Sequence, residues 1–266
     1  MVGNSVTPMT LKLPEAIARF IGDAQLVPDT VGESPCRVHS FYRGNERFFL
    51  KFSAALYAPT TYSVLREARV LDWLDGRLKV PELVLVESGA EGEFMITRTV
   101  PGAPLSSCIA AGQPALPLFR EALHQVQSVA VDECPFDAGV AMRFAELDYL
   151  MAQGLCAAEY DLTQWPGLAS PEALRAYLQR TRPIEDLVFS HGDLGDSNIF
   201  VDSRDELYFI DLGRGGLADC WLDIAFIQRD LREVLCEADA AEFLQGLGVP
   251  DNPSRRVFFE QLDELF

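Results

Sequence analysis

Short runs of apolar and polar residues fill the first hundred positions of the chain and predict β-strands at 36–42, 47–52, 83–87 and 93–100. Turn sequences separate neighbouring runs, RGN at 43–45 and AEG at 90–92, so we expect an antiparallel sheet. One segment, about 60–78, instead has apolar residues at helical spacing and predicts a single helix.

Beyond Pro101 the pattern becomes mostly helical. One β-like insertion, 187–211, interrupts it, with a hairpin predicted from 198–201 and 207–210 around the polar turn 202–205. Helices are predicted at about 115–129, 141–156, 171–181, 219–235, 238–246 and 254–265. The expected fold class is α+β, with a small antiparallel sheet lobe and one helix at 1–100, and a larger, mostly helical lobe at 101–266.

The composition is that of a folded protein. The 266 residues are 48% hydrophobic and 23% charged, which excludes disorder for most of the length. No apolar run reaches the roughly 18 residues of a spanning helix, and the first residues lack a signal-peptide pattern. We therefore expect a cytoplasmic protein without a membrane partner. Six scattered cysteines without a CxxC pair argue against a zinc or disulfide framework.

The negative charge is concentrated in the second part of the chain. Residues 1–100 carry 11 Lys/Arg and 12 Asp/Glu, whereas residues 101–266 carry 11 Arg, no Lys and 28 Asp/Glu. Such a surface repels nucleic-acid backbones, so a nucleic-acid partner is not expected. It attracts polycations, although solubility alone also explains acidic surfaces.

Candidate chemistry gathers in HGDLGDSN (191–198) and FIDLG (209–213). An aspartate in a glycine-flanked loop, an asparagine five residues later and a second aspartate after another strand can supply a base and two hard oxygen ligands. Such oxygens suit Mg²⁺. The arrangement of Asp193, Asn198 and Asp211 is similar to the catalytic loop and metal-binding aspartate of kinases. A polar hairpin with an Asx-turn would explain one of these residues but not all three.

A kinase also needs a strand lysine for the phosphates and an acidic helix residue that orients it. Lys51 lies in the apolar strand FFLKF (48–52), and Glu67 lies in the predicted helix. A lysine in such a strand is unfavourable unless it is paired or faces a cleft. The alternative is an edge-strand lysine that only limits aggregation.

Together these segments resemble the aminoglycoside 3′-phosphotransferases, and the resemblance runs nearly end to end. It implies a protein-kinase-like two-lobed fold and transfer of the ATP γ-phosphate, with Mg²⁺, to the 3′-hydroxyl of aminoglycosides such as kanamycin and neomycin, conferring antibiotic resistance. The matching segments are ESP (33–35), Lys51, TTY (60–62), Glu67, AELDYL (145–150), VFSHGDLGDSNIF (188–200), FIDLGR (209–214), DIAF (223–226) and LDELF (262–266).

The resemblance assigns roles to the central residues. Asp193 would orient or deprotonate the attacking hydroxyl. Asn198 and Asp211 would hold the Mg²⁺ ions, and Lys51, held by Glu67, would contact the nucleotide phosphates.

Further nucleotide contacts follow by the same resemblance. Ser34 would approach the β-phosphate, although a simple turn also explains it. Phe49, on the same strand face as Lys51, would stack on adenine or else belong to the core. Arg98 and Val100 match the hinge whose backbone binds the adenine edge.

The substrate side should be rich in carboxylates, because an aminoglycoside carries several ammonium groups. Matching positions are Glu159, Asp161, Glu233, Glu264 and the terminal carboxylate of Phe266, with Arg214 near the transferred phosphate or the substrate. Segment 157–168 departs from the pattern of close relatives, so the drug spectrum stays open. His191 is expected to be structural, packed under the loop.

Two other readings of the sequence remain. One is a related kinase of another cationic or hydroxylated small molecule, such as choline, a macrolide or an amino sugar. The other is a catalytically dead acidic protein that sequesters polycations; the intact kinase elements argue against it. The choice between ATP and GTP, and between a monomer and a weak homodimer, stays open.

Overall fold

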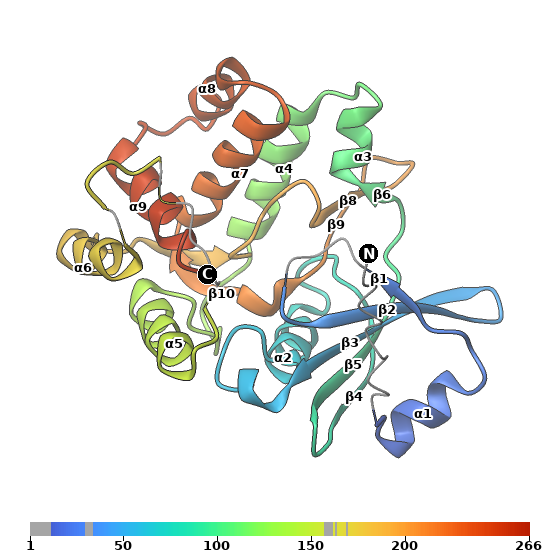
Figure 1. Ribbon diagram of the computed structural model, residues 1–266. Helices are drawn as coiled ribbons and strands as arrows, with labels where there is room; N and C mark the ends of the chain where they lie inside the picture. Colours follow the sequence, from blue (N-terminus) through green and yellow to red (C-terminus); the bar gives the residue numbers. More distant parts are fainter. Residues whose placement is uncertain (1–11, 30–33, 157–161, 163, 169) are drawn as a thin grey trace, which may run out of the picture.

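The computed structural model describes residues 12–29, 34–156, 162, 164–168 and 170–266. Its first part contains an antiparallel sheet built from β1 (Val27–Asp29), β2 (Arg37–Arg43), β3 (Glu46–Ala54), β4 (Leu83–Ser88) and β5 (Gly92–Arg98). The strand order is β1-β2-β3-β5-β4, so β3 lies at the centre, hydrogen-bonded to β2 and β5. Figure 1 shows this sheet on one side of the molecule and most helices on the other.

The alternation of side chains along β3 gives the sheet two different faces. Phe48 and Leu50 are buried and pack with α1 (Glu15–Ile21), which contributes Ile17 and Ile21 to the same cluster. The intervening Phe49 and Lys51 point to the opposite face because successive strand residues alternate.

Helix α2 (Val64–Leu74) begins at Ser63, whose side chain accepts a hydrogen bond from the Arg66 N–H as an N-cap. Its buried apolar residues include Val70 and Leu74, and these belong to the large core formed with the helices beyond residue 100. The cluster under α1 is separate. Helix α2 therefore shares its apolar packing with the second part of the chain, although it lies in the first hundred residues.

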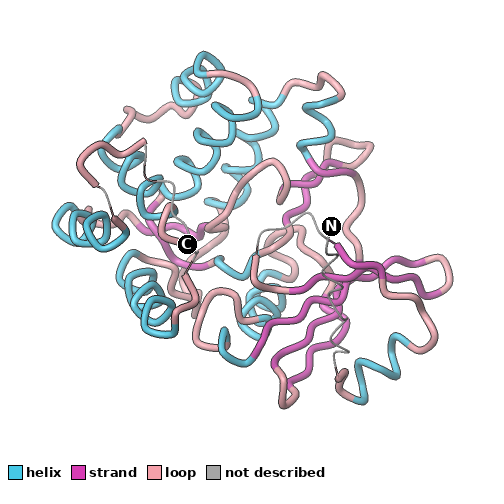
Figure 2. Tube along the Cα trace, viewed as in Figure 1, coloured by secondary structure: helices cyan, strands magenta, loops and turns pink. Residues whose placement is uncertain are grey.

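The second part is mainly helical (Figures 1 and 2). Two small sheets accompany the helices. In one, β7 (Leu187–Ser190) pairs with β10 (Gly216–Asp219); in the other, β8 (Ile199–Val201) lies between β6 (Ala103–Pro104) and β9 (Leu207–Phe209). Gly102 precedes β6 with φ +87°, and a Cβ there would lie 2.2 Å from the Val201 carbonyl oxygen, so only glycine fits this crossing. The remaining elements are η1 (Ala55–Tyr57) in the first part of the chain and, in the second part, α3 (Leu105–Ala110), α4 (Ala115–Gln127), α5 (Val140–Gln153), α6 (Pro171–Thr181), η2 (Leu212–Arg214), α7 (Trp221–Val234), α8 (Glu237–Gln245) and α9 (Pro253–Asp263).

The predicted α+β class and the hairpin within the insertion are confirmed. The sequence pattern missed α1, β1, β6, α3 and β10, each of which has at most seven residues. Elements this short carry too few periods to be recognised, and partners distant in the sequence stabilise them. The predicted helix at 60–78 was too long at both ends: it begins after the Ser63 cap and ends at Leu74. Among the described residues, no helix is long and apolar enough to cross a membrane.

Candidate active site

The loop after β7 is held in place by a buried carboxylate from α7. Asp223 is fully buried, and its two oxygens accept the backbone N–H groups of His191 and Gly192, each at 2.9 Å. Gly192 has φ +82°, and a Cβ there would lie 2.7 Å from the Arg214 carbonyl oxygen. The loop conformation thus depends on a helix that begins some 30 residues later in the chain.

Within this loop, Asn198 orients Asp193. The Asn198 amide nitrogen donates to the Asp193 backbone oxygen at 2.9 Å and to its carboxylate at 3.1 Å. Burial raises the pKa of the Asp193 carboxyl, while the nearby Arg214 guanidinium acts to lower it. Because its nitrogen is engaged, the Asn198 amide oxygen is left as an acceptor.

Asp211, Lys51 and Glu67 form one charged group. The Lys51 Nζ atom lies 2.7 Å from Glu67 and 2.5 Å from Asp211. Burial acts to lower the pKa of Lys51, but the two carboxylates raise it overall. Lys51 in turn lowers the pKa of Asp211, and burial raises the pKa of Glu67 against the effect of Lys51.

Asp211 also has an unusual backbone conformation, φ 60° and ψ 52°, in the left-handed region. Aspartate tolerates this region better than most residues, but the conformation is still strained. It occurs where β9 ends and η2 begins, and it brings the carboxylate to Lys51 of β3.

The donor set fits Mg²⁺. No cluster of three His, Cys, Asp or Glu side chains that could hold a metal exists among the described residues. Mg²⁺, however, usually takes one or two carboxylates and completes its shell with phosphate oxygens and water. The Asn198 amide oxygen and the half-exposed Asp211 carboxylate supply hard oxygen donors of this kind.

The remaining nucleotide-side candidates lie around Lys51. Phe49 shares its face and is half-buried, with the Arg47 guanidinium 4.9 Å from the ring centre. Ser34 is exposed, and its hydroxyl accepts the Cys36 N–H at 3.0 Å, as in a simple turn. The contact of Phe49 with adenine and the contact of Ser34 with the β-phosphate therefore stay predictions.

At the predicted hinge, the Arg98 guanidinium does not point toward the sheet face that carries Phe49 and Lys51. Its side chain bonds Glu82 at 2.8 Å and also Glu46, and it lies over the Phe48 ring on the α1 side of the sheet. Its backbone N–H donates to the Glu82 oxygen at 3.0 Å. Val100, which follows, is buried.

On the substrate side, Arg214 is anchored by α9. It bonds Asp263 at 3.1 Å and the Tyr62 hydroxyl at 3.3 Å, so it is no surface ion pair. The Phe266 ring centre lies 5.9 Å from the Arg214 guanidinium carbon, and the Glu264 carboxylate accepts from Gln164 at 2.5 Å. Phe266 therefore lies beside Arg214, and Figure 1 shows the C-terminal end close to β10.

The structure adds a pair of carboxylates that sequence reasoning missed. Asp196 follows Asp193 in the loop, and its N–H donates to Asp230 of α7 at 2.7 Å. Burial and the neighbouring Asp196 raise the pKa of Asp230 to about 7. Among the described residues, neither carboxylate has an ion-pair partner within 4.0 Å. Exposed Glu233, one turn further on α7, adds to the negative potential.

Of the other predicted residues, Glu159 and Asp161 lie outside the described residues. His191 is fully buried, and its Nε2 atom lies 2.9 Å from the Ile210 oxygen. Asp263 was also missed as a site residue. The terminal LDELF segment was a signal for it, but sequence alone did not indicate which of its carboxylates meets Arg214.

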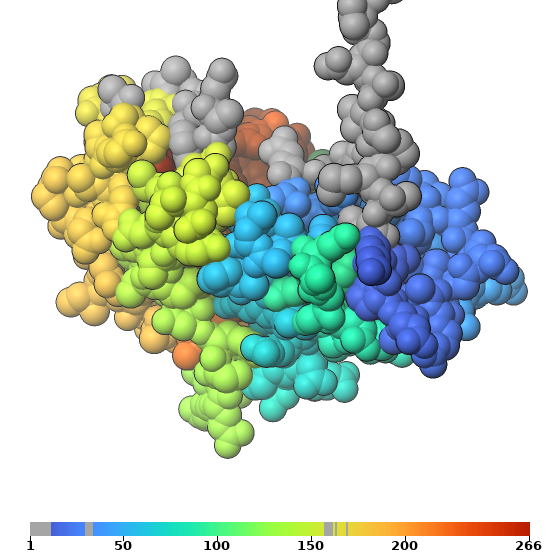
Figure 3. Space-filling view, turned by 60° about the horizontal axis from the view of Figure 1, so that its bottom comes forward, coloured from blue at the N-terminus to red at the C-terminus, as the bar shows by residue number. Residues whose placement is uncertain are grey.

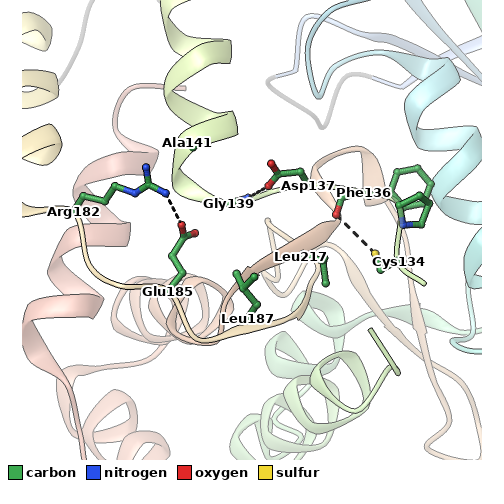
Figure 4. A pocket seen from close by; sticks show the side chains of 10 residues that line it. Cys134, Phe136, Asp137, Gly139, Ala141, Arg182, Glu185, Leu187 and Leu217 are labelled. Atoms are coloured by element: carbon green, nitrogen blue, oxygen red, sulfur yellow. Dashed lines mark hydrogen bonds and ion pairs between the residues drawn. The ribbon is translucent and has the colours of Figure 1, made fainter. Parts of the chain in front are cut away.

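Two cavities lie away from Lys51, Asp193 and Asp211. One, of about 410 Å³, contains the Arg182–Glu185 ion pair and Asp137, with Leu187 and Leu217 on its wall (Figure 4). A groove of about 1220 Å³ runs along Lys79 and Tyr208. Neither is lined by Lys51, Asp193 or Asp211, so neither is the candidate active site.

A central lysine–glutamate pair on the sheet side, opposite Asp193 and Asn198 of the loop after β7 and Asp211 after β9, defines a protein-kinase-like phosphotransferase. Comparison with known proteins agrees. The profile of the phosphotransferase enzyme family matches residues 34–258, and the chain belongs to this family.

Similar proteins are named as aminoglycoside 3′- or 3″-phosphotransferases. The chain is 43% identical to an aminoglycoside 3′-phosphotransferase of Acinetobacter baumannii over 96% of this chain and 100% of the relative. The crystal structure of an aminoglycoside 3′-phosphotransferase of type VIII matches with TM-score 0.77 and 27% identity, over 94% of this chain and 97% of that one. A Streptomyces rimosus aminoglycoside phosphotransferase, solved with ADP and streptomycin, shares the fold at TM-score 0.73, 23% identity and 93% and 95% coverage.

Proposed function

We propose that this protein is an aminoglycoside 3′-phosphotransferase that transfers the γ-phosphoryl group of ATP to the 3′-hydroxyl of a polycationic aminoglycoside. The observation that carries the choice of a cationic substrate is the Asp196–Asp230 pair beside Asp193. Among the described residues neither carboxylate forms an ion pair within 4.0 Å. The two groups repel each other, and a bound ammonium group would relieve that repulsion. The names of the relatives point to the same substrate class.

In the proposed mechanism, Lys51 binds the nucleotide phosphates from the sheet side, and Glu67 keeps its ammonium group oriented. Asn198 and Asp211 would hold Mg²⁺, which when bound neutralises charge on the phosphates. Asp193, oriented by Asn198, accepts a hydrogen bond from the substrate hydroxyl and directs its oxygen at the γ-phosphorus.

The substrate would enter between the loop that carries Asp196 and the helices α7 and α9. Asp196, Asp230 and Glu233 would bind ammonium groups, with Glu264 and the Phe266 carboxylate on the other side. Arg214 stays bonded to Asp263, where its charge stabilises the Asp193 carboxylate. Use of ATP implies the cytoplasm as the place of action. The lobe boundary near Pro101 and the oligomeric state stay predictions.

The test compares two antibiotics that differ at the reacting position. Purified protein with ATP and Mg²⁺ should phosphorylate kanamycin, whereas the 3′-deoxy drug tobramycin should bind as a competitive inhibitor and not turn over, because it keeps the ammonium groups but lacks the nucleophile. Phosphorylation of tobramycin at the rate of kanamycin would overturn the 3′ position but not the kinase mechanism. No turnover of any aminoglycoside would overturn the function.

A further inference from the structure

Two segments that match the family so well, AELDYL (145–150) and TTY (60–62), have no role in the mechanism above. In the structure they meet. The Glu146 carboxylate of α5 accepts the Thr61 backbone N–H at 2.6 Å and the Thr61 hydroxyl at 2.8 Å with a single oxygen. Both residues are buried, Thr61 7% and Glu146 5% exposed.

The same turn is held from the opposite side by a carboxylate of the sheet. Glu93 of β5 accepts the Ser63 hydroxyl at 2.8 Å, the Leu65 N–H at 3.1 Å and the Ser53 hydroxyl at 3.3 Å. The segment from Thr61 to the first turn of α2 is therefore bonded by two buried carboxylates, one from the sheet and one from α5.

Other contacts bond α5 and α2 to neighbouring segments across the same boundary. The Tyr149 hydroxyl, one turn after Glu146, donates to the Leu56 oxygen at 2.6 Å. Arg66 of α2 donates to the backbone oxygens of Gly213, Gly215 and Asp137, two of them just beyond Asp211. In Figure 3 the yellow-green surface of α5 lies directly against the cyan surface of η1 and the start of α2.

Helix α5 also contacts the catalytic loop. Arg143, one turn before Glu146 and 3% exposed, donates to the Gly192 oxygen at 3.1 Å. One buried face of α5 thus bonds both the loop that carries Asp193 and the turn that starts the helix carrying Glu67.

We propose that Glu146 is a positioning residue for phosphoryl transfer: through Thr61 it fixes the start of α2 so that Glu67 stays paired with Lys51. Glu67 lies six residues after Thr61, in the first turn of α2, so a displacement of the turn that precedes the helix moves it directly. These contacts would hold the protein with the Lys51–Glu67 pair formed. The inference rests on the proposed use of ATP.

The experiment compares kcat/KM for ATP, at saturating kanamycin, among variants of the full chain. Glu146→Ala should lower it about 10- to 100-fold, the loss expected for a misplacement of about 1 Å. Glu146→Gln keeps the accepting oxygen and should restore it, and Thr61→Ser should likewise retain what Thr61→Val loses. Asp148→Ala is the matched control, because it breaks only the α5–α6 bond to Arg175.

A double-mutant cycle with Glu67→Gln separates positioning from folding. If Glu146 acts through Glu67, then Glu146→Ala should add little in the Glu67→Gln background. Full additivity would overturn the proposal, as would a Glu146→Ala variant that loses thermal stability like Asp148→Ala with unchanged ATP kinetics. Should Glu146→Ala not fold, Thr61→Val against Thr61→Ser gives the same test. Activity of the unchanged protein in the same assay tests the proposed function separately.

Discussion

Replacing Lys51 by methionine should destabilise the protein by an amount that grows with pH. Methionine has a similar length and no charge, so the change leaves Glu67 buried without its partner. Removing one member of a buried ion pair costs about 3–5 kcal/mol. Glu67, with its side chain 6% exposed, accounts for this loss, whereas Asp211, 43% exposed, can be solvated.

The pH dependence follows from the direction of the Glu67 pKa. Burial already raises it above 4.5, and without Lys51 its largest opposing influence disappears. A group whose pKa is raised on folding contributes full stability below its unfolded pKa and loses it as the pH rises through the folded pKa. The variant should therefore be near its most stable at about pH 4–5 and lose about 1.4 kcal/mol per pH unit above that, until the folded pKa is passed.

Thermal denaturation at about pH 5 and about pH 8 measures this difference. A loss of about 3 kcal/mol corresponds to a fall in Tm of about 6 °C or more at this chain length. The double variant Lys51→Met/Glu67→Gln should recover most of the pH-dependent part, since it removes the buried charge. Equal losses at both pH values, or a double variant less stable than the single one, would refute the assignment of the loss to Glu67.

Three further predictions follow from the site. Asp193→Ala should lower kcat by at least about 100-fold while nucleotide affinity, measured by titration calorimetry, stays near wild type, because the carboxylate acts on the acceptor; retained turnover would contradict this role. Asp230→Asn should remove the part of the stability that the wild type loses between about pH 4 and pH 7, where the raised pKa of Asp230 keeps a proton on the folded state only; an unchanged pH–Tm curve would contradict it. Gly102→Ala should lower Tm because its Cβ would overlap the Val201 oxygen, whereas Gly112→Ala, also at positive φ but with free space, should lower Tm less; equal effects would show that strain at positive φ alone matters.

Part of the central site could be predicted from the sequence, because the information for that part is local. Asp193 and Asn198 are five residues apart in one loop, and their spacing alone places the amide against the carboxylate. The alternation along β3 put Lys51 and Phe49 on one face, opposite buried Phe48 and Leu50. The α+β fold class could also be predicted from the sequence, because long segments show a regular period of apolar residues.

Only the tertiary structure decided which distant carboxylates meet which partners. Asp230 reaches the Asp196 backbone across 34 residues, Arg214 reaches Asp263 across 49, and Glu146 reaches Thr61 across 85. Helical periodicity places Glu146, Asp230 and Asp263 each on one side of a helix. It cannot indicate which other element that side packs against. That choice depends on how the cores pack, and a buried carboxylate is stable only where the completed fold supplies donors for it.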